Sequence, residues 1–139
     1  MIVVDTSIWV AALRDGRSDD AGVLSALLDA DEVALAVPVR LELLAGASAL
    51  DRPRLRRALS ALPLLYPTDD TWRLLAGWVE SAASVGHRFG VGDLLIGALA
   101  AEAGALVWSA DGDFDRMDAL GFVGAYASTR RDTSSIDVR

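Results

Sequence analysis

The sequence predicts an α/β domain of three layers, in which helices cover both faces of a mainly parallel sheet. Two observations support this fold class. Short apolar runs that are typical of buried strands alternate along the chain with longer segments of helical periodicity. Neither an internal repeat nor a linker-like change of composition interrupts this alternation. Parallel neighbours require a crossover connection, and a helix between successive strands supplies it.

The first half opens with a strand that runs directly into a helix. The β-branched run 2–4 ends in polar residues, and 8–13 then has a helical pattern. After a polar turn, the apolar residues of 21–29 fall on one face of a second helix. A buried strand is expected over 32–37, closed by a proline, and a helix follows over 39–47.

The middle of the chain alternates in the same way. An Arg-rich helix is expected over 51–62, and the segment 63–67 between two prolines fits a short strand or connector. Thr68 is a suitable cap for a longer helix, Asp69 to about Ser84. An apolar helix over 93–103 and a strong strand over 105–108 come next.

The last part of the chain is acidic and then polar. Residues 111–120 are expected to form an acidic loop with a short helix, and 122–126 a final strand. Nothing divides the chain before this point, so 1–127 is predicted to be one domain. The polar segment 128–139 is expected to be a mobile tail.

Composition excludes several kinds of chemistry. The 139 residues suffice for one packed domain, and the absence of Cys excludes disulfides, thiolate metal sites and catalytic thiols. A single His excludes a His-rich metal site, and all 13 basic residues are Arg. No signal-peptide pattern opens the chain, and the apolar stretch 94–110 fits a helix followed by a strand. The sequence therefore predicts a soluble cytoplasmic protein whose chemistry rests on carboxylates, hydroxyls and Arg.

Several acidic residues follow predicted strands or begin predicted helices. In an open parallel sheet, sites lie beyond the carboxyl ends of the strands. Asp5 follows the first strand, Asp111 and Asp113 follow the strand over 105–108, and Glu42 and Asp93 lie near the starts of helices. Each also has an ordinary interpretation. Asp93 could be a helix N-cap, and Glu42 could be a solvated helix position. Asp111 and Asp113 could be ordinary turn residues.

The order of these acids resembles the PIN domain, a family of metal-dependent ribonucleases that includes VapC-type toxins. Residues 4–7, Val-Asp-Thr-Ser, resemble its opening motif, and 40–43 match its helix-borne Glu. Residues 92–98 resemble the third acidic motif, and 109–114, Ser-Ala-Asp-Gly-Asp-Phe, resemble the fourth. The resemblance covers positions 2 to about 126, with all four motifs in order. Ala110 departs from the polar or basic residue that is frequent at its position.

The resemblance implies a PIN-like domain that acts as a Mg²⁺- or Mn²⁺-dependent endoribonuclease, the toxin of a toxin–antitoxin pair. It further implies a homodimer and an antitoxin that binds near the active site. Converging carboxylates repel one another unless protons or cations are present, and oxygen ligands alone favour Mg²⁺ or Mn²⁺. Whether one or two ions bind, and whether Asp111, Asp113 or both act, stays open. The expected metal ligands are Asp5, Glu42, Asp93 and Asp111, with Asp113 as an outer or alternative ligand. Ser7 and Ser109 would contact a metal-bound water or a phosphate; alternatively, their hydroxyls only close turns.

A net charge of −7 opposes RNA binding at long range, so the phosphate contacts must be local. Arg14, Arg40 and Arg88 lie next to the motifs and are the expected phosphate contacts, whereas 52–57 favours a solvated helix face. Two other functions are considered. One is a PIN-like RNA- or protein-binding module without catalysis. The other is a phosphotransfer domain using Asp5, which would in most designs need a Lys that this chain lacks.

Overall fold

The computed structural model describes residues 1–127 and contains one parallel sheet of four strands. The strands are β1 (Ile2–Val4), β2 (Val33–Ala36), β3 (Leu64–Leu65) and β4 (Leu106–Trp108), in the spatial order β3-β2-β1-β4. Of the two alternatives for 63–67, a short strand or a connector, the strand is present as β3. The predicted parallel α/β sheet is confirmed, and the segment 128–139, expected to be a tail, lies outside the described residues.

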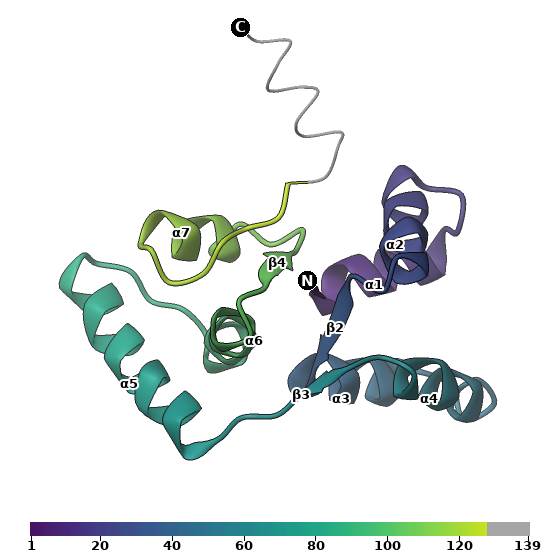
Figure 1. The fold of residues 1–139 in the computed structure, drawn as a ribbon, viewed down its shortest axis with the longest axis horizontal. Helices are drawn as coiled ribbons and strands as arrows, with labels where there is room; N and C mark the ends of the chain where they lie inside the picture. Colours follow the sequence, from purple (N-terminus) through teal and green to yellow (C-terminus); the bar gives the residue numbers. More distant parts are fainter. Residues whose placement is uncertain (128–139) are drawn as a thin grey trace, which may run out of the picture.

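Helices occupy both sides of this sheet (Figure 1). Helices α5, α6 and α7 lie on one side, and α1 and α2 lie on the other, while α3 and α4 form a pair next to β2 and β3. No helix in residues 1–127 is long and apolar enough to cross a membrane. The helices are α1 (Thr6–Arg14), α2 (Asp19–Asp29), α3 (Val37–Gly46), α4 (Arg52–Ser60), α5 (Asp69–Ser84), α6 (Val91–Glu102) and α7 (Asp113–Ala119).

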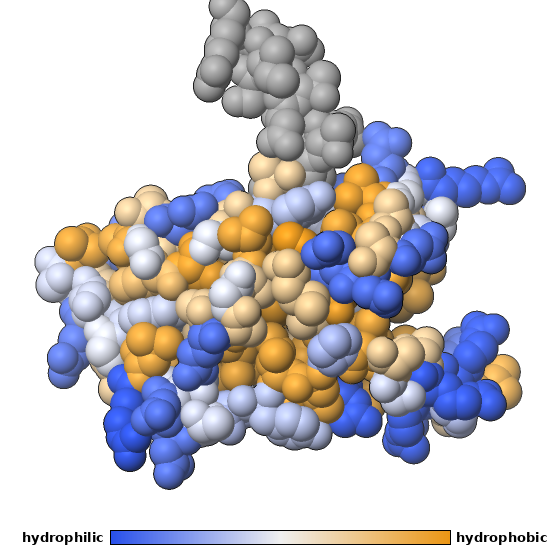
Figure 2. All heavy atoms as spheres, in the orientation of Figure 1, coloured by the Kyte–Doolittle hydropathy of each residue, from blue (hydrophilic) through white to orange (hydrophobic). Residues whose placement is uncertain are grey.

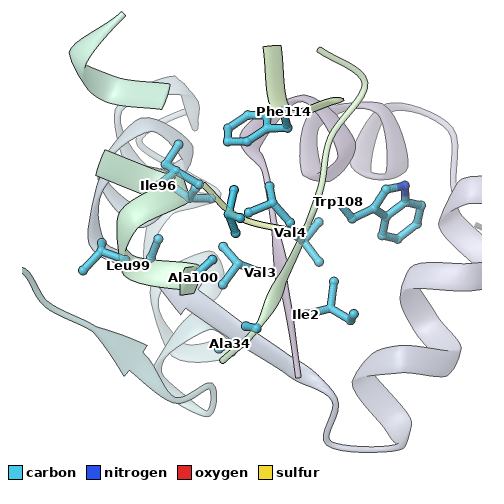
Figure 3. Packing of buried hydrophobic residues seen from close by; sticks show 14 of the residues in the cluster. Ile2, Val3, Val4, Ala34, Ile96, Leu99, Ala100, Trp108 and Phe114 are labelled. Atoms are coloured by element: carbon cyan, nitrogen blue, oxygen red, sulfur yellow. The ribbon is translucent and has the colours of Figure 1, made fainter. Parts of the chain in front are cut away.

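Helix α6 is the central helix of the core. It contacts β1, β2 and β4, and six of its residues are buried, which fits its almost entirely apolar sequence. Figure 3 shows Val3 facing the Ile96 and Ala100 side of α6, whereas Ile2 and Trp108 lie on the other side of the sheet. This alternation follows from the period of two along a strand, so a run of β-branched residues buries both faces.

The prediction of a strand over 122–126 is wrong. Only an isolated bridge forms there, between Val107 and Ala125, with hydrogen bonds from Val107 N to Gly124 O (2.9 Å) and from Tyr126 N to Val107 O (2.8 Å). The chain must first turn back from α7, through Gly121 at a φ of 78°. Too few residues then run beside β4 to make a ladder.

Four helices begin two residues earlier than expected, namely α1, α2, α3 and α6. Two of these starts have a clear local reason. Helix α3 begins at Val37 and includes Pro38 in its first turn, where a missing N–H costs no hydrogen bond. Helix α6 begins at Val91, two residues before the expected start, and Gly90 is its N-cap. The interpretation of Asp93 as an N-cap is therefore wrong, because Asp93 is the third residue of the helix.

Candidate active site

Asp5 lies at the carboxyl end of β1 and is buried, with 7% of its surface exposed. The parallel register pairs Val4 with Trp108, so the residues that follow β1 and β4 emerge side by side. The amide of Asp5 donates to Trp108 O (2.8 Å). Its carboxylate Oδ2 accepts hydrogen bonds from Ser109 Oγ (2.7 Å) and Ser7 Oγ (3.0 Å). Within residues 1–127 the other oxygen, Oδ1, accepts no hydrogen bond, so it has lone pairs for a ligand.

The two serine hydroxyls also hold the loop after β4. Ser109 Oγ accepts from the amide of Asp111 (2.9 Å), and Ser7 Oγ accepts from the amide of Ala110 (3.1 Å). An ionised carboxylate can only accept, so both hydroxyls are the donors in their contacts with Asp5, and the two hydroxyls also lie 3.4 Å from each other. The serines thereby orient the Asp5 carboxylate and tie the start of α1 to the loop. Their contact with a metal-bound water or a phosphate stays a prediction.

Three further carboxylates meet at the same edge of the sheet. Asp93, Asp111 and Asp113 each place an oxygen within 4.8 Å of the others, and we call these residues the acidic cluster. Asp93 comes from the first turn of α6, while Asp111 and Asp113 come from the loop after β4 and the start of α7. The sheet and α6 therefore bring together acids that are about 20 residues apart in the sequence.

Asp93 has an unusual protonation equilibrium. Burial raises its pKa from 3.8 to about 7, helped by the negative charges of Asp111 and then of Asp5. A protonated Asp93 also forms side-chain hydrogen bonds with Asp111 and Asp113, which raises the pKa further. The influence of Asp5 shows that its carboxylate is electrostatically part of the same site. A cation in the site would stabilise the ionised form of Asp93 and would therefore lower its pKa again.

The loop carrying Asp111 and Asp113 is internally bonded. The amide of Asp113 donates to Asp111 Oδ1 (3.0 Å), as expected for a turn. The guanidinium of Arg116 forms an ion pair with Asp113 across one turn of α7. The turn interpretation and the ligand interpretation of these acids are therefore compatible.

The remaining predicted residues lie elsewhere. Glu42 is exposed on α3 and lies outside the acidic cluster, lining a groove together with Arg14. Arg40 is half-buried on α3, and Arg88 is exposed in the loop before α6. In residues 1–127 no ion pair joins Arg14, Arg40 or Arg88 to the cluster.

Sequence reasoning missed Arg116, the cation that does contact the cluster. The available signal was its spacing of three from Asp113, which places the two side chains on one face of a helix. Reasoning by motif order had singled out the acids and passed over the neighbouring base.

The donor set of the site fits a hard divalent cation. It consists of carboxylate oxygens, without His or sulfur, that are gathered at one edge of the sheet. Burial and the neighbouring carboxylates raise the pKa of Asp93, so its ionised form is unfavourable unless a positive charge is near. The acidic cluster can therefore hold a divalent metal ion, with Asp5 beside it.

The fold and site together define a class: an α/β domain with a parallel sheet and an acidic centre beyond its carboxyl edge. Comparison with known proteins gives the family. The PIN domain family model matches residues 2–120. Ribonuclease VapC11 of Mycobacterium tuberculosis is 36% identical over 122 residues, which cover 83% of this chain and 90% of that protein. The chain therefore belongs to the PIN domain family, and its similarity extends to the VapC ribonucleases within it.

Solved structures agree with this assignment. VapBC2 from Rickettsia felis, bound to a DNA fragment, matches with a TM-score of 0.73 and 20% identity, over 91% of this chain and 98% of that chain. VapBC-5 from M. tuberculosis, a toxin–antitoxin system, matches with a TM-score of 0.61 and 27% identity, over 91% and 97% of the two chains. The predicted PIN-like fold is thus confirmed.

Proposed function

We propose that this protein is a metal-dependent endoribonuclease and the toxin of a toxin–antitoxin pair. The observation that carries the proposal is the meeting of Asp93, Asp111 and Asp113 beside Asp5 at the carboxyl edge of the sheet. The identity of 36% to named VapC ribonucleases, over most of both chains, supports RNA as the substrate. The cytoplasm, where RNA is available, is the proposed site of action.

Each residue of the site has a role in this proposal. Asp5, Asp93 and Asp111 are the proposed ligands of Mg²⁺ or Mn²⁺, and Ser7 and Ser109 hold Asp5 in its orientation. The bound ion would supply an activated water and would stabilise the negative charge that develops on the phosphate. Val4 and Leu94, the chain neighbours of Asp5 and Asp93, are buried in the hydrophobic core and anchor the two acids to it.

Glu42 keeps a proposed role at the periphery. It lies outside the acidic cluster, but it lines the same groove as Arg14. We propose that a bound water links its exposed carboxylate to the site when RNA is present. Arg14, Arg40 and Arg88 stay the proposed phosphate contacts, because guanidinium groups pair well with phosphate oxygens.

The groove between α1, α3 and α4 is the proposed binding site of the antitoxin. It has a volume of about 710 Å³, and its walls include Val10, Leu13, Leu43 and Leu55. Leu13 is 63% exposed, which is costly to leave uncovered in water. An amphipathic helix with apolar residues at helical spacing would cover these side chains. The charged residues of the groove are of both signs, Arg14 and Arg54 with Glu42 and Asp51, so such a helix would carry both signs on its flanks. The similarity to VapBC-5, a toxin–antitoxin system, supports an antitoxin as the partner.

A second apolar surface favours the proposed homodimer. Trp72 and Val79 are 48% and 51% exposed on α5, and Ala76 and Ala83 are exposed at the same helical spacing. Helix α5, which carries this stripe, lies at the opposite end of the molecule from α4 (Figure 1). A second copy could bury the stripe without blocking the groove. The view in Figure 2 shows that charged and apolar side chains are otherwise mixed, with hydrophilic ones gathered over α4.

The experiment that tests the function is RNA cleavage with and without a chelator. Wild type with Mg²⁺ or Mn²⁺ should cleave a structured RNA internally, and EDTA should stop cleavage. Asp5→Asn should lower the rate by at least about 100-fold, because it changes a proposed ligand. Asp115→Asn is the matched control, since Asp115 is exposed on α7 and outside the acidic cluster.

Two results would contradict the proposal. If RNA stays intact while Mn²⁺ binds, the alternative of a PIN-like binding module gains support. If cleavage survives in EDTA and in Asp5→Asn, the activity comes from a contaminating nuclease or from another site. Labelling of Asp5 by a phosphoryl donor, with no cleavage of RNA, would instead support the phosphotransfer alternative.

A further inference from the structure

One carboxylate of the acidic cluster already has a positively charged partner. The guanidinium of Arg116 forms an ion pair with Asp113. Within residues 1–127 this is the one ion pair that reaches the cluster, because the other two join Met1 to Glu32 and Arg73 to Asp70. The three acids are therefore not equivalent: Asp113 is neutralised by a neighbour, whereas Asp93 and Asp111 are not.

The backbone and the turn hold this pair in place. Asp113 is the first residue of α7, and its amide donates to Asp111 Oδ1 (3.0 Å). Arg116 Nη1 lies over the turn, 3.6 Å from the position that a Cβ on Gly112 would occupy. The side chain of Arg116 is 51% exposed and that of Asp113 is 24% exposed, so the cation lies on the solvent side. The charge of Arg116 is permanent, because a guanidinium does not lose its proton in a protein.

We propose that Arg116 is a positioning residue of the metal site. By pairing with Asp113 it removes one of three competing carboxylates, so that Asp93 and Asp111 are the cluster acids that ligate the ion. Asp113 then acts by orienting the turn and not by direct ligation. The part of this inference that concerns turnover rests on the proposed function, whereas the part that concerns metal binding does not.

The experiment measures Mn²⁺ affinity by calorimetry on the folded protein without RNA, and then kcat and KM on RNA. Arg116→Gln removes one positive charge and should tighten Mn²⁺ binding by about tenfold, the effect of a unit charge on a divalent ion across about 6 Å of water-like dielectric. It should lower kcat while KM for RNA stays the same, because Asp113 becomes a competing ligand.

The double variant Asp113→Asn/Arg116→Gln removes a neutral pair. It should return Mn²⁺ affinity to within about threefold of wild type and recover most of the lost kcat. Asp111→Asn should instead weaken Mn²⁺ binding by more than about tenfold. The matched control is Arg73→Gln, which breaks the other ion pair of the same i,i+3 spacing, on α5, and should change neither quantity.

Three outcomes would overturn the inference. If the double variant binds Mn²⁺ as weakly as Asp111→Asn, then Asp113 is a direct ligand. If Arg116→Gln raises KM for RNA and the double variant does not recover, then Arg116 contacts phosphate. If Arg116→Gln changes nothing, the ion pair has no role in the site. If metal binding follows the prediction but no form of the protein cleaves RNA, the role of Arg116 stands and the proposed function fails.

Discussion

Asp93 leads to a specific prediction about stability, because the ionised form of its carboxyl group is unfavourable in the metal-free folded protein. Its pKa is raised from 3.8 to about 7, mainly by burial and then by the charges of Asp111 and Asp5. A folded-state pKa above the unfolded value means that folding favours the protonated form. This contribution to stability is fully present below pH 4 and is lost as pH rises through about 7.

The magnitude follows from the size of the shift. At 1.36 kcal/mol per pKa unit, the full shift corresponds to at most about 4 kcal/mol. Asp93 is only partly buried and three acids share the site, so screening reduces this to about 1–2 kcal/mol. In EDTA at pH 8, Asp93→Asn should therefore be more stable than wild type by about 1–2 kcal/mol. For a chain of this size that corresponds to an increase in Tm of about 4–8 °C.

The assay is thermal melting by circular dichroism in EDTA from pH 4.5 to pH 8.5. The difference between variant and wild type should shrink toward zero at the acid end. Mn²⁺ at about 100 times its Kd should stabilise wild type by about 2.7 kcal/mol and should leave the variant nearly unchanged. Asp69→Asn is a control, because Asp69 is exposed in the first turn of α5 and its loss should cost up to about 1 kcal/mol. A variant that is less stable than wild type at pH 8 would refute the reasoning.

Two other substitutions test contacts that the structure shows. Ser109→Ala should destabilise the protein by about 1–3 kcal/mol in urea unfolding, because it removes a donor to buried Asp5 and an acceptor for the amide of Asp111. The same variant should slow RNA cleavage, and Ser109→Thr should restore both stability and cleavage. Arg52→Ala should lower the free energy of unfolding by about 1–2 kcal/mol, because it removes two hydrogen bonds to carbonyls at the end of α3, and kcat on RNA should not change. The control Arg56→Ala should have little effect on either quantity, because Arg56 is exposed. A neutral Ser109→Ala or an equally costly Arg56→Ala would contradict these assignments.

The sequence was a good guide to the elements whose local signals agree. Helix α5 begins at Asp69 and ends at Ser84 as expected, because Thr68 and Thr71 form a capping box and apolar residues repeat at helical spacing. The prediction of a strand over 122–126 was wrong, because an apolar run does not indicate how many of its residues lie beside a neighbouring strand. The start of α6 at Val91 was not predicted either, since its N-cap, Gly90, has no side chain to indicate a cap.

In the basic segment 52–57, one arginine, Arg52, has a structural role that the other three do not have. The sequence favoured a solvated helix face, and Arg54, Arg56 and Arg57 are indeed exposed on α4. Arg52 instead donates from Nε to Leu44 O (3.0 Å) and from Nη2 to Ala47 O (2.8 Å). It therefore completes the end of α3, which depends on how the two helices pack.

The sequence by itself determined the alternation of strands and helices, the exclusion of thiol and His chemistry, and the identity of the acids. Those properties depend on residue types and on spacing along the chain. Only the tertiary structure decided which acids meet. Asp93, Asp111 and Asp113 converge, Glu42 lies outside them, and Arg116 pairs with one of them. The physical reason is that interactions between charges depend on distances in space, and those distances are set by sheet register and helix packing rather than by order in the chain.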